Sequence, residues 1–226
     1  MQIKGSELSV IKYLYGKKCY LEPLLQGDVG FRFSDLSHYS RMENEMMRDE
    51  EMSKLFLINK GEGILKINDH VINPEHLVGD PQVRINTRHC FCLCLSNRKD
   101  SSELYEKFKV DVCIEVKVTE FEEFLRDLFT KKFQGMSVIG RDITYYEKYS
   151  LPSTSDFVDL VFYKPSIFSH EAEYRIALFY PLDKPGFADE NGNVIPFIKD
   201  DESMHLTMTY TDKGFFNQFI GKVYEP

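Results

Sequence analysis

The stretch from residue 170 to residue 180, HEAEYRIALFY, constrains the fold of this chain most strongly. Glu171 and Glu173 open a run of aromatic and β-branched side chains, a composition typical of a β-strand. Side chains two residues apart on a strand share a face, so Glu171, Glu173 and Arg175 are predicted to point the same way. The alternate residues are predicted to point into a core: Ala172, Tyr174, Ile176 and Leu178.

Two carboxylates on one face of a strand are costly, because like charges raise each other's pKa. Two interpretations of Glu171 and Glu173 follow from this pattern. The pair lies either on a solvated edge face, with Arg175 as counter-ion, or in a site that uses the two acids.

The overall charge limits the classes of partner. The chain has 226 residues and a formal net charge of −8, which argues against a surface that wraps a nucleic-acid backbone but leaves room for a local basic cleft. Its apolar content of 42% is that of a globular protein, and its length suits one large domain or two small ones. We predict a single domain over residues 1–226.

The five cysteines indicate a reducing compartment. Cys90, Cys92 and Cys94 alternate within an apolar run that predicts a buried strand, and no C-x-x-C pair is present, so we expect no metal site. The sequence shows no signal peptide and no apolar run of membrane-spanning length. We therefore expect a cytoplasmic protein that does not contact a membrane.

Local patterns predict an α+β fold with a strand-rich centre and two flanking helices. Strands are predicted at 10–15, 30–35, 83–86, 90–96, 110–118, 171–180, 203–211 and 219–224. Hairpins are predicted at 61–73, around Asn68-Asp69, and at 137–145, around Gly140-Arg141. Helices are predicted at 20–26, 41–57, 103–108 and 119–133, with a capping box of Thr119 and Glu122 at the start of the last. Residues 157–163 suit a helix or a strand, and Asp159 with the following Lys164-Pro165 favours the helix.

Four features in chain order carry a family resemblance. They are Tyr13-Leu14-Tyr15, Cys94-Leu95-Ser96, Ile143-Thr144-Tyr145-Tyr146, and Lys164 followed by Glu171-Ala172-Glu173-Tyr174-Arg175. Over residues 10–180 the chain resembles a widespread, largely uncharacterised bacterial and phage domain family. That family is in turn remotely similar to ADP-ribosyltransferases, including the DarT-like DNA-modifying toxins.

This resemblance implies a fold and a set of site residues. The fold is a central split β-structure with flanking helices, in which the strands 10–15, 90–96 and 171–180 share one sheet and the helix 119–133 packs against it. The resemblance makes Glu173 and Glu171 catalytic and makes Ser96, Tyr15 and Arg32 binding residues for NAD, the substrate. Arg32 takes the place of the His or Arg that those enzymes carry on their first strand, because no such residue stands near Tyr15-Gly16.

The chemistry implied by the resemblance suits these residue types. Breaking the nicotinamide–ribose bond creates an oxocarbenium-like centre that a carboxylate stabilises, here Glu173. Glu171 would accept the proton of the incoming nucleophile, and an arginine would pair with the pyrophosphate. Glu173 and Ser96 are therefore expected to border one pocket, and Glu173→Gln is expected to abolish activity while leaving the fold intact.

Two classes of function follow from the resemblance. The first is an ADP-ribosyltransferase that modifies a protein or nucleic-acid acceptor as a toxin or effector in conflict between bacteria and phages. The second is a catalytically inactive protein on the same scaffold that binds a protein partner, such as an antitoxin or a host protein.

Overall fold

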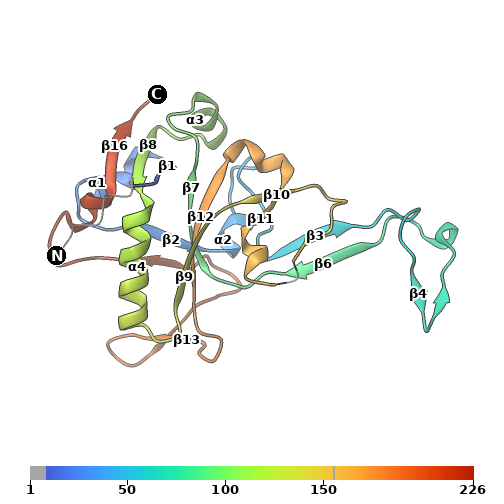
Figure 1. Ribbon diagram of the computed structural model, residues 1–226. Helices are drawn as coiled ribbons and strands as arrows, with labels where there is room; N and C mark the ends of the chain where they lie inside the picture. The colour runs from blue at the N-terminus through green and yellow to red at the C-terminus, as the bar shows by residue number, and fades with distance from the viewer. Residues whose placement is uncertain (1–8, 155) are drawn as a thin grey trace, which may run out of the picture.

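The computed structural model describes residues 9–154 and 156–226 and is built around one eight-stranded antiparallel sheet (Figure 1). The first eight residues, on which the prediction of no signal peptide rests, lie outside the described residues. The strands of the sheet are β15 (His205–Thr207), β2 (Arg32–Asp35), β7 (Phe91–Ser96), β1 (Ile11–Gly16), β8 (Val112–Lys117), β16 (Ile220–Tyr224), β12 (Glu173–Phe179) and β9 (Ser137–Asp142). The predicted α+β class is confirmed.

The sheet divides at β7. One edge of β7 pairs with β12 along its whole length, from Ser96 opposite Glu173 to Phe91 opposite Leu178. The other edge is shared, because β2 pairs with Phe91 and Cys92 while β1 pairs with Ser96. The prediction that the strands 10–15, 90–96 and 171–180 share one sheet is confirmed.

The sheet has a core on each face. On one face, Ile176 and Leu178 pack with Phe121 and Leu125 of α4 (Val118–Lys132), the longest helix. On the other face, Ala177 and Phe179 of β12 pack in a smaller core with buried residues from outside this strand: Leu36, Cys90, Cys92, Ile143, Val161 and Phe162. Strand β12 is thus buried on both faces, and the interpretation of a solvated edge is wrong.

The start of α4 differs from the prediction. No side chain caps the helix, and the buried Glu122 accepts hydrogen bonds from Tyr174 Oη of β12 and from Arg126 instead. The hydroxyl of Thr119 accepts from the backbone N–H of Val10, 3.3 Å away. The predicted capping box is therefore wrong, because the Glu122 carboxylate accepts from Tyr174 of β12 instead of binding the start of its own helix.

The predicted helix 41–57 is also wrong. The chain forms the short helix α2 (Ser37–Ser40), a series of turns, and then β3 (Ser53–Leu57), which pairs with β6 (Gln82–Asn86). Lys54 and Phe56 are buried while Leu55 between them is exposed. This two-residue period belongs to a strand, and pairing with β6 stabilises it.

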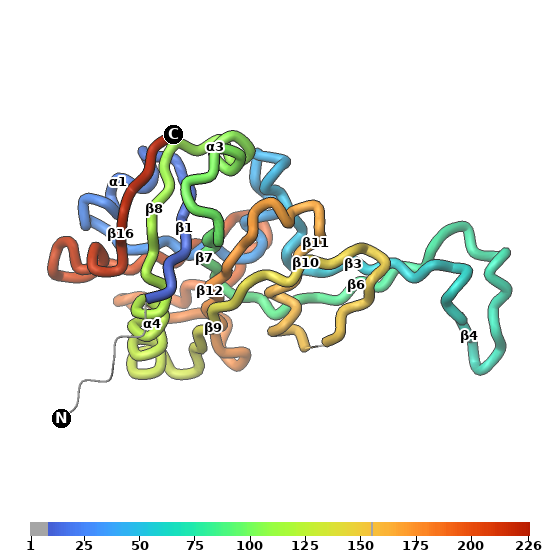
Figure 2. The backbone as a smooth tube through the Cα atoms, turned by 45° about the horizontal axis from the view of Figure 1, so that its top comes forward, coloured from blue at the N-terminus to red at the C-terminus, as the bar shows by residue number. Residues whose placement is uncertain are grey.

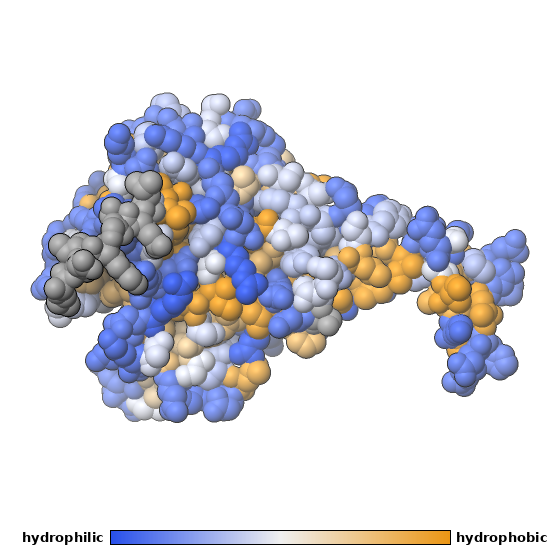
Figure 3. Space-filling view, in the orientation of Figure 1, coloured by the Kyte–Doolittle hydropathy of each residue, from blue (hydrophilic) through white to orange (hydrophobic). Residues whose placement is uncertain are grey.

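Beyond β3 and β6 the chain projects as an arm, defined here as residues 58–81 (Figures 1 and 2). The arm carries β4 (Lys66–Ile67), β5 (His70–Val71) and a 3₁₀ turn, η1 (Pro74–His76). Asn68 and Asp69 both adopt left-handed backbone angles, φ 47° and 69°, as a tight hairpin turn requires. The predicted hairpin is confirmed, and Figure 3 shows apolar side chains exposed along the arm.

One further prediction fails at β9, and another holds in part after it. Gly140 and Arg141 form no turn, since they lie inside β9, which pairs with β12 from Ser137 to Asp142. Residues 157–163, for which a helix was favoured over a strand, contain a 3₁₀ helix, η2 (Asp159–Phe162), that leads into β11 (Tyr163–Pro165), which pairs in parallel with β10 (Thr144–Tyr146). The other elements are α1 (Lys18–Leu25), α3 (Ser102–Phe108), η3 (Ser166–Glu171), η4 (Phe215–Phe219), β13 (Gly186–Ala188) and β14 (Val194–Pro196).

At 15 residues, α4 is too short for a membrane span. No other helix in residues 9–154 and 156–226 has the length and apolar content that a span needs.

Candidate functional site

A cavity of about 70 Å³ lies at the C-terminal end of β7, where β1 and β2 diverge. We name it the β7 cavity. Four of the five predicted site residues line it: Tyr15, Ser96, Glu171 and Glu173. They come from three distant stretches of sequence, so only the tertiary fold brings them together. Lys164 and two more tyrosines, Tyr13 and Tyr39, complete its polar lining.

Arg32 is the predicted site residue that the structure separates from this cavity. It is exposed on β2, where its Nη2 lies 3.1 Å from His205 Nε2. Lys164 is the only cationic side chain among the described residues that line the cavity. An arginine partner for pyrophosphate is therefore missing from the described lining.

The two acids converge, but not by strand alternation. Strand β12 begins at Glu173, whereas Glu171 ends the 3₁₀ turn η3, and Ala172 between them adopts a left-handed φ of 44°. The prediction that both acids lie on one strand is wrong. Both carboxylates nevertheless reach Lys164 Nζ, which lies 2.6 Å from Glu171 Oε2 and 3.3 Å from Glu173 Oε2.

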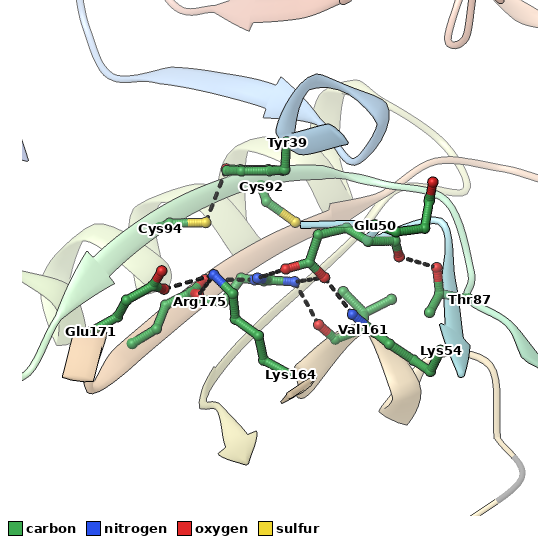
Figure 4. Close-up of polar contacts among 12 residues, drawn as sticks. Tyr39, Glu50, Lys54, Thr87, Cys92, Cys94, Val161, Lys164, Glu171 and Arg175 are labelled. Atoms are coloured by element: carbon green, nitrogen blue, oxygen red, sulfur yellow. Dashed lines mark hydrogen bonds and ion pairs between the residues drawn. The ribbon is translucent and has the colours of Figure 1, made fainter. Parts of the chain in front are cut away.

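These three residues end a longer series of buried charges, which we name the ion chain (Figure 4). Its members alternate in sign: Lys54, Glu51, Arg175, Glu173, Lys164 and Glu171. Arg175 lies at its centre, with Nε 2.7 Å from Glu173 Oε1 and Nη2 2.7 Å from Glu51 Oε1. At the far end, Lys54 Nζ lies 2.6 Å from Glu51 Oε2.

The ion chain contains three acids and three bases, and every member is buried. Buried charges are tolerated when they are paired and hydrogen-bonded. Here the carbonyl of Val161 also accepts from Arg175 Nη1, at 2.7 Å. One end of the chain lies in the interior beside β3, and the other lines the β7 cavity.

Burial and charge separate the pKa values of the two acids. Burial raises the pKa of Glu173, but Arg175 and Lys164 outweigh it and hold that pKa at about 2. Burial, with the neighbouring Glu173 charge, raises the pKa of Glu171 to about 8 against the opposing effect of Lys164. A carboxyl that titrates near neutral pH and lines a cavity is a candidate proton acceptor.

The hydroxyl of Ser96 forms two hydrogen bonds to the backbone of neighbouring segments. Its Oγ donates to the carbonyl of Glu171 at 2.6 Å and accepts from the N–H of Arg98 at 3.0 Å. Ser96 therefore fixes the end of η3 beside β7 and so positions Glu171.

Tyr15 is anchored in the same way. Its Oη donates to the carbonyl of Arg98 at 2.7 Å and accepts from the N–H of Ser101 at 2.8 Å. Its ring packs edge-on against Tyr105 and Phe108, with centroids 5.4 and 6.1 Å away. Tyr15 therefore contributes a fixed aromatic wall rather than a free hydroxyl.

Sequence reasoning missed several residues of this site. Glu51 and Lys54 fell inside the predicted helix 41–57, and no local pattern marks them as partners of Arg175. Tyr39 was also missed; its Oη lies 2.9 Å from Cys94 Sγ on the wall of the cavity. Lys164 did stand in the motif that carries the resemblance, and that motif was the one signal available.

No protein-family model, curated protein or solved structure matches this chain. Among the described residues, no group of three or more His, Cys, Asp or Glu side chains is arranged to hold a metal ion.

Proposed function

We propose that this chain is an ADP-ribosyltransferase on an ADP-ribosyltransferase-like fold, and that it cleaves the nicotinamide–ribose bond of NAD at the β7 cavity. One observation carries the proposal. Glu171 and Glu173 line one cavity with Tyr15 and Ser96, although these residues come from three distant parts of the chain. Lys164, which separates the two carboxylates, holds both at the same wall.

The two acids take different roles in the proposed reaction. The C1′–N bond breaks and its electron pair leaves with nicotinamide, while an oxygen or nitrogen of the acceptor attacks C1′. Glu171 accepts the proton of that nucleophile, because its raised pKa lies close to neutral pH. Glu173 stays ionised, and its negative charge faces the developing cation at the ribose.

The size of the cavity limits how NAD binds. A site that encloses a whole drug-sized ligand has roughly 300–1,000 Å³, whereas the β7 cavity has about 70 Å³. Only one end of NAD enters it as it stands. We assign this end to the nicotinamide and its ribose, which the rings of Tyr13, Tyr15 and Tyr39 flank.

Release of nicotinamide from NAD is the direct test. We expect wild type to release nicotinamide and to label a protein or nucleic acid in a cell lysate with ADP-ribose. Glu171→Gln should lower the rate about 10²–10⁴-fold, the typical contribution of a general base. Glu106→Gln is the matched control, because Glu106 is exposed on α3, away from the cavity lining.

The pH dependence sharpens this test. Because Glu171 must lose its proton to act as a base, the rate should rise with pH until the pH passes about 8. A wild type that neither binds NAD nor releases nicotinamide would remove the enzyme proposal.

A second candidate is a catalytically inactive protein that binds a protein partner. The arm favours it, since its apolar side chains Ile64, Ile67, Val71 and Val78 are all more than half exposed, and exposed apolar patches mark interaction sites. Deleting residues 60–80 should abolish partner capture under this hypothesis and leave nicotinamide release unchanged under the first. If wild type releases nicotinamide, the molecule labelled in the lysate identifies the acceptor. If the arm captures a protein, that phage, host or antitoxin protein is the partner.

A further inference from the structure

A second hollow lies at the opposite end of β7 from the β7 cavity. It has a volume of about 560 Å³ and is bordered by the end of β6, the segment that joins β6 to β7, Phe157 and Leu182. Its polar lining consists of Arg84, Asn86, Thr87, Arg88 and His89, with no acid among the described lining residues. We name it the Arg84 hollow. On a chain with a formal net charge of −8, such a concentration of basic groups is unexpected.

No acidic side chain in the described part of the chain pairs with Arg84 or Arg88. Arg84 Nη1 lies 3.2 Å from the Ser53 hydroxyl, and Arg88 Nη2 donates to the carbonyl of Tyr180. Both of these partners are neutral, and neither arginine forms an ion pair within residues 9–154 and 156–226. Guanidinium groups bind oxyanions through two parallel hydrogen bonds, so an anion is the partner that this pair of side chains lacks.

His89 gives an independent sign of a missing partner. Its side chain is about nine-tenths buried, and Nδ1 lies 2.6 Å from Tyr180 Oη. The other ring nitrogen, Nε2, is buried without a hydrogen-bond partner in the described part of the chain. Buried polar atoms of this kind are rare in folded proteins. If Tyr180 donates to Nδ1, the neutral ring carries its proton on Nε2, so a buried N–H of a residue that lines the hollow lacks an acceptor in the described part of the chain.

The remaining wall is apolar. The ring of Phe157 is more than half exposed beside the hollow, and Ile85 and Leu182 border it as well. An exposed aromatic ring next to cationic groups suits a ligand that joins a phosphate to a flat ring, since nucleobases stack on aromatic side chains. The volume lies within the range of small-molecule sites.

We propose that the Arg84 hollow binds a mononucleotide, with its phosphate on Arg84 and Arg88 and its base against Phe157. Arg84 and Asn86 share one face of β6, roughly 7 Å apart along the strand, and both line the hollow, so the Asn86 amide adds a polar group near Arg84. This site is separate from the proposed NAD reaction at the β7 cavity, because the two hollows have no lining residue in common.

Binding of AMP, adenosine and inorganic phosphate to the full chain, measured by calorimetry, tests the proposal. We expect AMP to bind more tightly than phosphate and adenosine not to bind. Arg84→Gln should weaken AMP at least tenfold, whereas Lys131→Gln, the same loss of charge at an exposed position of α4, should leave its affinity unchanged. Phe157→Ala should weaken AMP but not phosphate.

The Glu171→Gln variant tests whether the AMP site is distinct from the proposed NAD site. The proposal requires AMP to bind normally to Glu171→Gln, whatever happens to nicotinamide release. AMP binding that survives Arg84→Gln, or adenosine that binds as well as AMP, would overturn it. Arg84 is exposed, and the one hydrogen bond of its side chain to the described residues goes to the hydroxyl of Ser53, so the variant is expected to fold, and thermal unfolding checks this.

Discussion

Arg175 holds Glu51 through two hydrogen bonds, with Nη2–Oε1 at 2.7 Å and Nη1–Oε2 at 3.0 Å, across 124 residues of sequence. Both side chains are fully buried. This pair ties the turn before β3 to the central strand β12. It also holds Arg175 in the orientation from which Nε reaches Glu173, so the proposed site depends on a residue outside its own cavity.

Glu51→Gln is expected to destabilise the protein by about 3–5 kcal/mol, because it leaves Arg175 and Lys54 buried without their shared acid. Urea unfolding at neutral pH measures the change. The neighbouring Glu50 is exposed, so Glu50→Gln should change the free energy of unfolding by less than about 0.5 kcal/mol. Equal stability of the two variants would show that the ion chain does not hold the fold.

Glu173→Gln is expected to destabilise as well as inactivate, which corrects the expectation of an intact fold. The carboxylate is buried, and its two oxygens meet Arg175 and Lys164. Its loss should cost about 3 kcal/mol, measured by denaturant unfolding. Glu171→Gln has one cationic partner, Lys164, and should cost less. The rate of nicotinamide release should therefore be compared per folded molecule, and a Glu173→Gln variant as stable as wild type would contradict this account.

The pKa of Glu171 predicts how stability varies with pH. Its folded pKa of about 8 lies above the ordinary value of 4.5, so between these values the folded state holds a proton that the unfolded state has released. The stability due to this group is complete below about pH 4.5 and is lost as pH rises towards 8. The loss is at most about 1.4 kcal/mol per pH unit.

Urea unfolding at several values between pH 5 and pH 8 measures this loss. The glutamine of Glu171→Gln does not titrate, so this variant should show a flatter dependence than wild type. Glu173 acts in a lower window, because its pKa of about 2 adds stability that is lost only as pH falls from about 4.5 towards 2. Parallel profiles for wild type and Glu171→Gln above pH 5 would argue against a raised pKa.

Gly140→Ala is expected to loosen the packing of α4 on the sheet. A Cβ at this position would overlap the Glu122 carboxylate and lie 2.6 Å from Tyr174 Oη. Overpacking of this kind typically costs 1–3 kcal/mol, and the midpoint of thermal unfolding measures it. Gly79→Ala is the control, since a Cβ there meets no atom within 4 Å. A Gly140→Ala midpoint equal to that of Gly79→Ala would mean that Glu122 moves aside without cost.

Local sequence patterns predicted much of the sheet. The apolar runs at β1, β7, β8 and β12 were predicted as strands, because their aromatic and β-branched side chains suit a pleated surface buried on both sides. The hairpin turn at Asn68-Asp69 was equally local, since these residue types tolerate left-handed backbone angles. The helix α4 was also predicted, although from a capping box of Thr119 and Glu122 that the structure does not form.

Long-range packing decided the elements that the sequence mispredicted. The segment 41–57 carries apolar residues at helical spacing, yet pairing with β6 makes Ser53–Leu57 a strand. Gly140-Arg141 resembles a turn, but pairing with β12 keeps the backbone extended through it. In both places the hydrogen bonds of a partner strand outweighed a weak local preference.

The sequence by itself determined that Glu171, Glu173 and Arg175 would be close together, because they are neighbours in the chain. Only the tertiary structure decided their chemistry. It buried all three, brought Lys164 between the acids and supplied Glu51 from 124 residues away. Burial and opposite charges act in opposite directions on a carboxyl, and their balance holds Glu173 ionised while raising the pKa of Glu171. That balance depends on distances between distant segments, which no local pattern encodes.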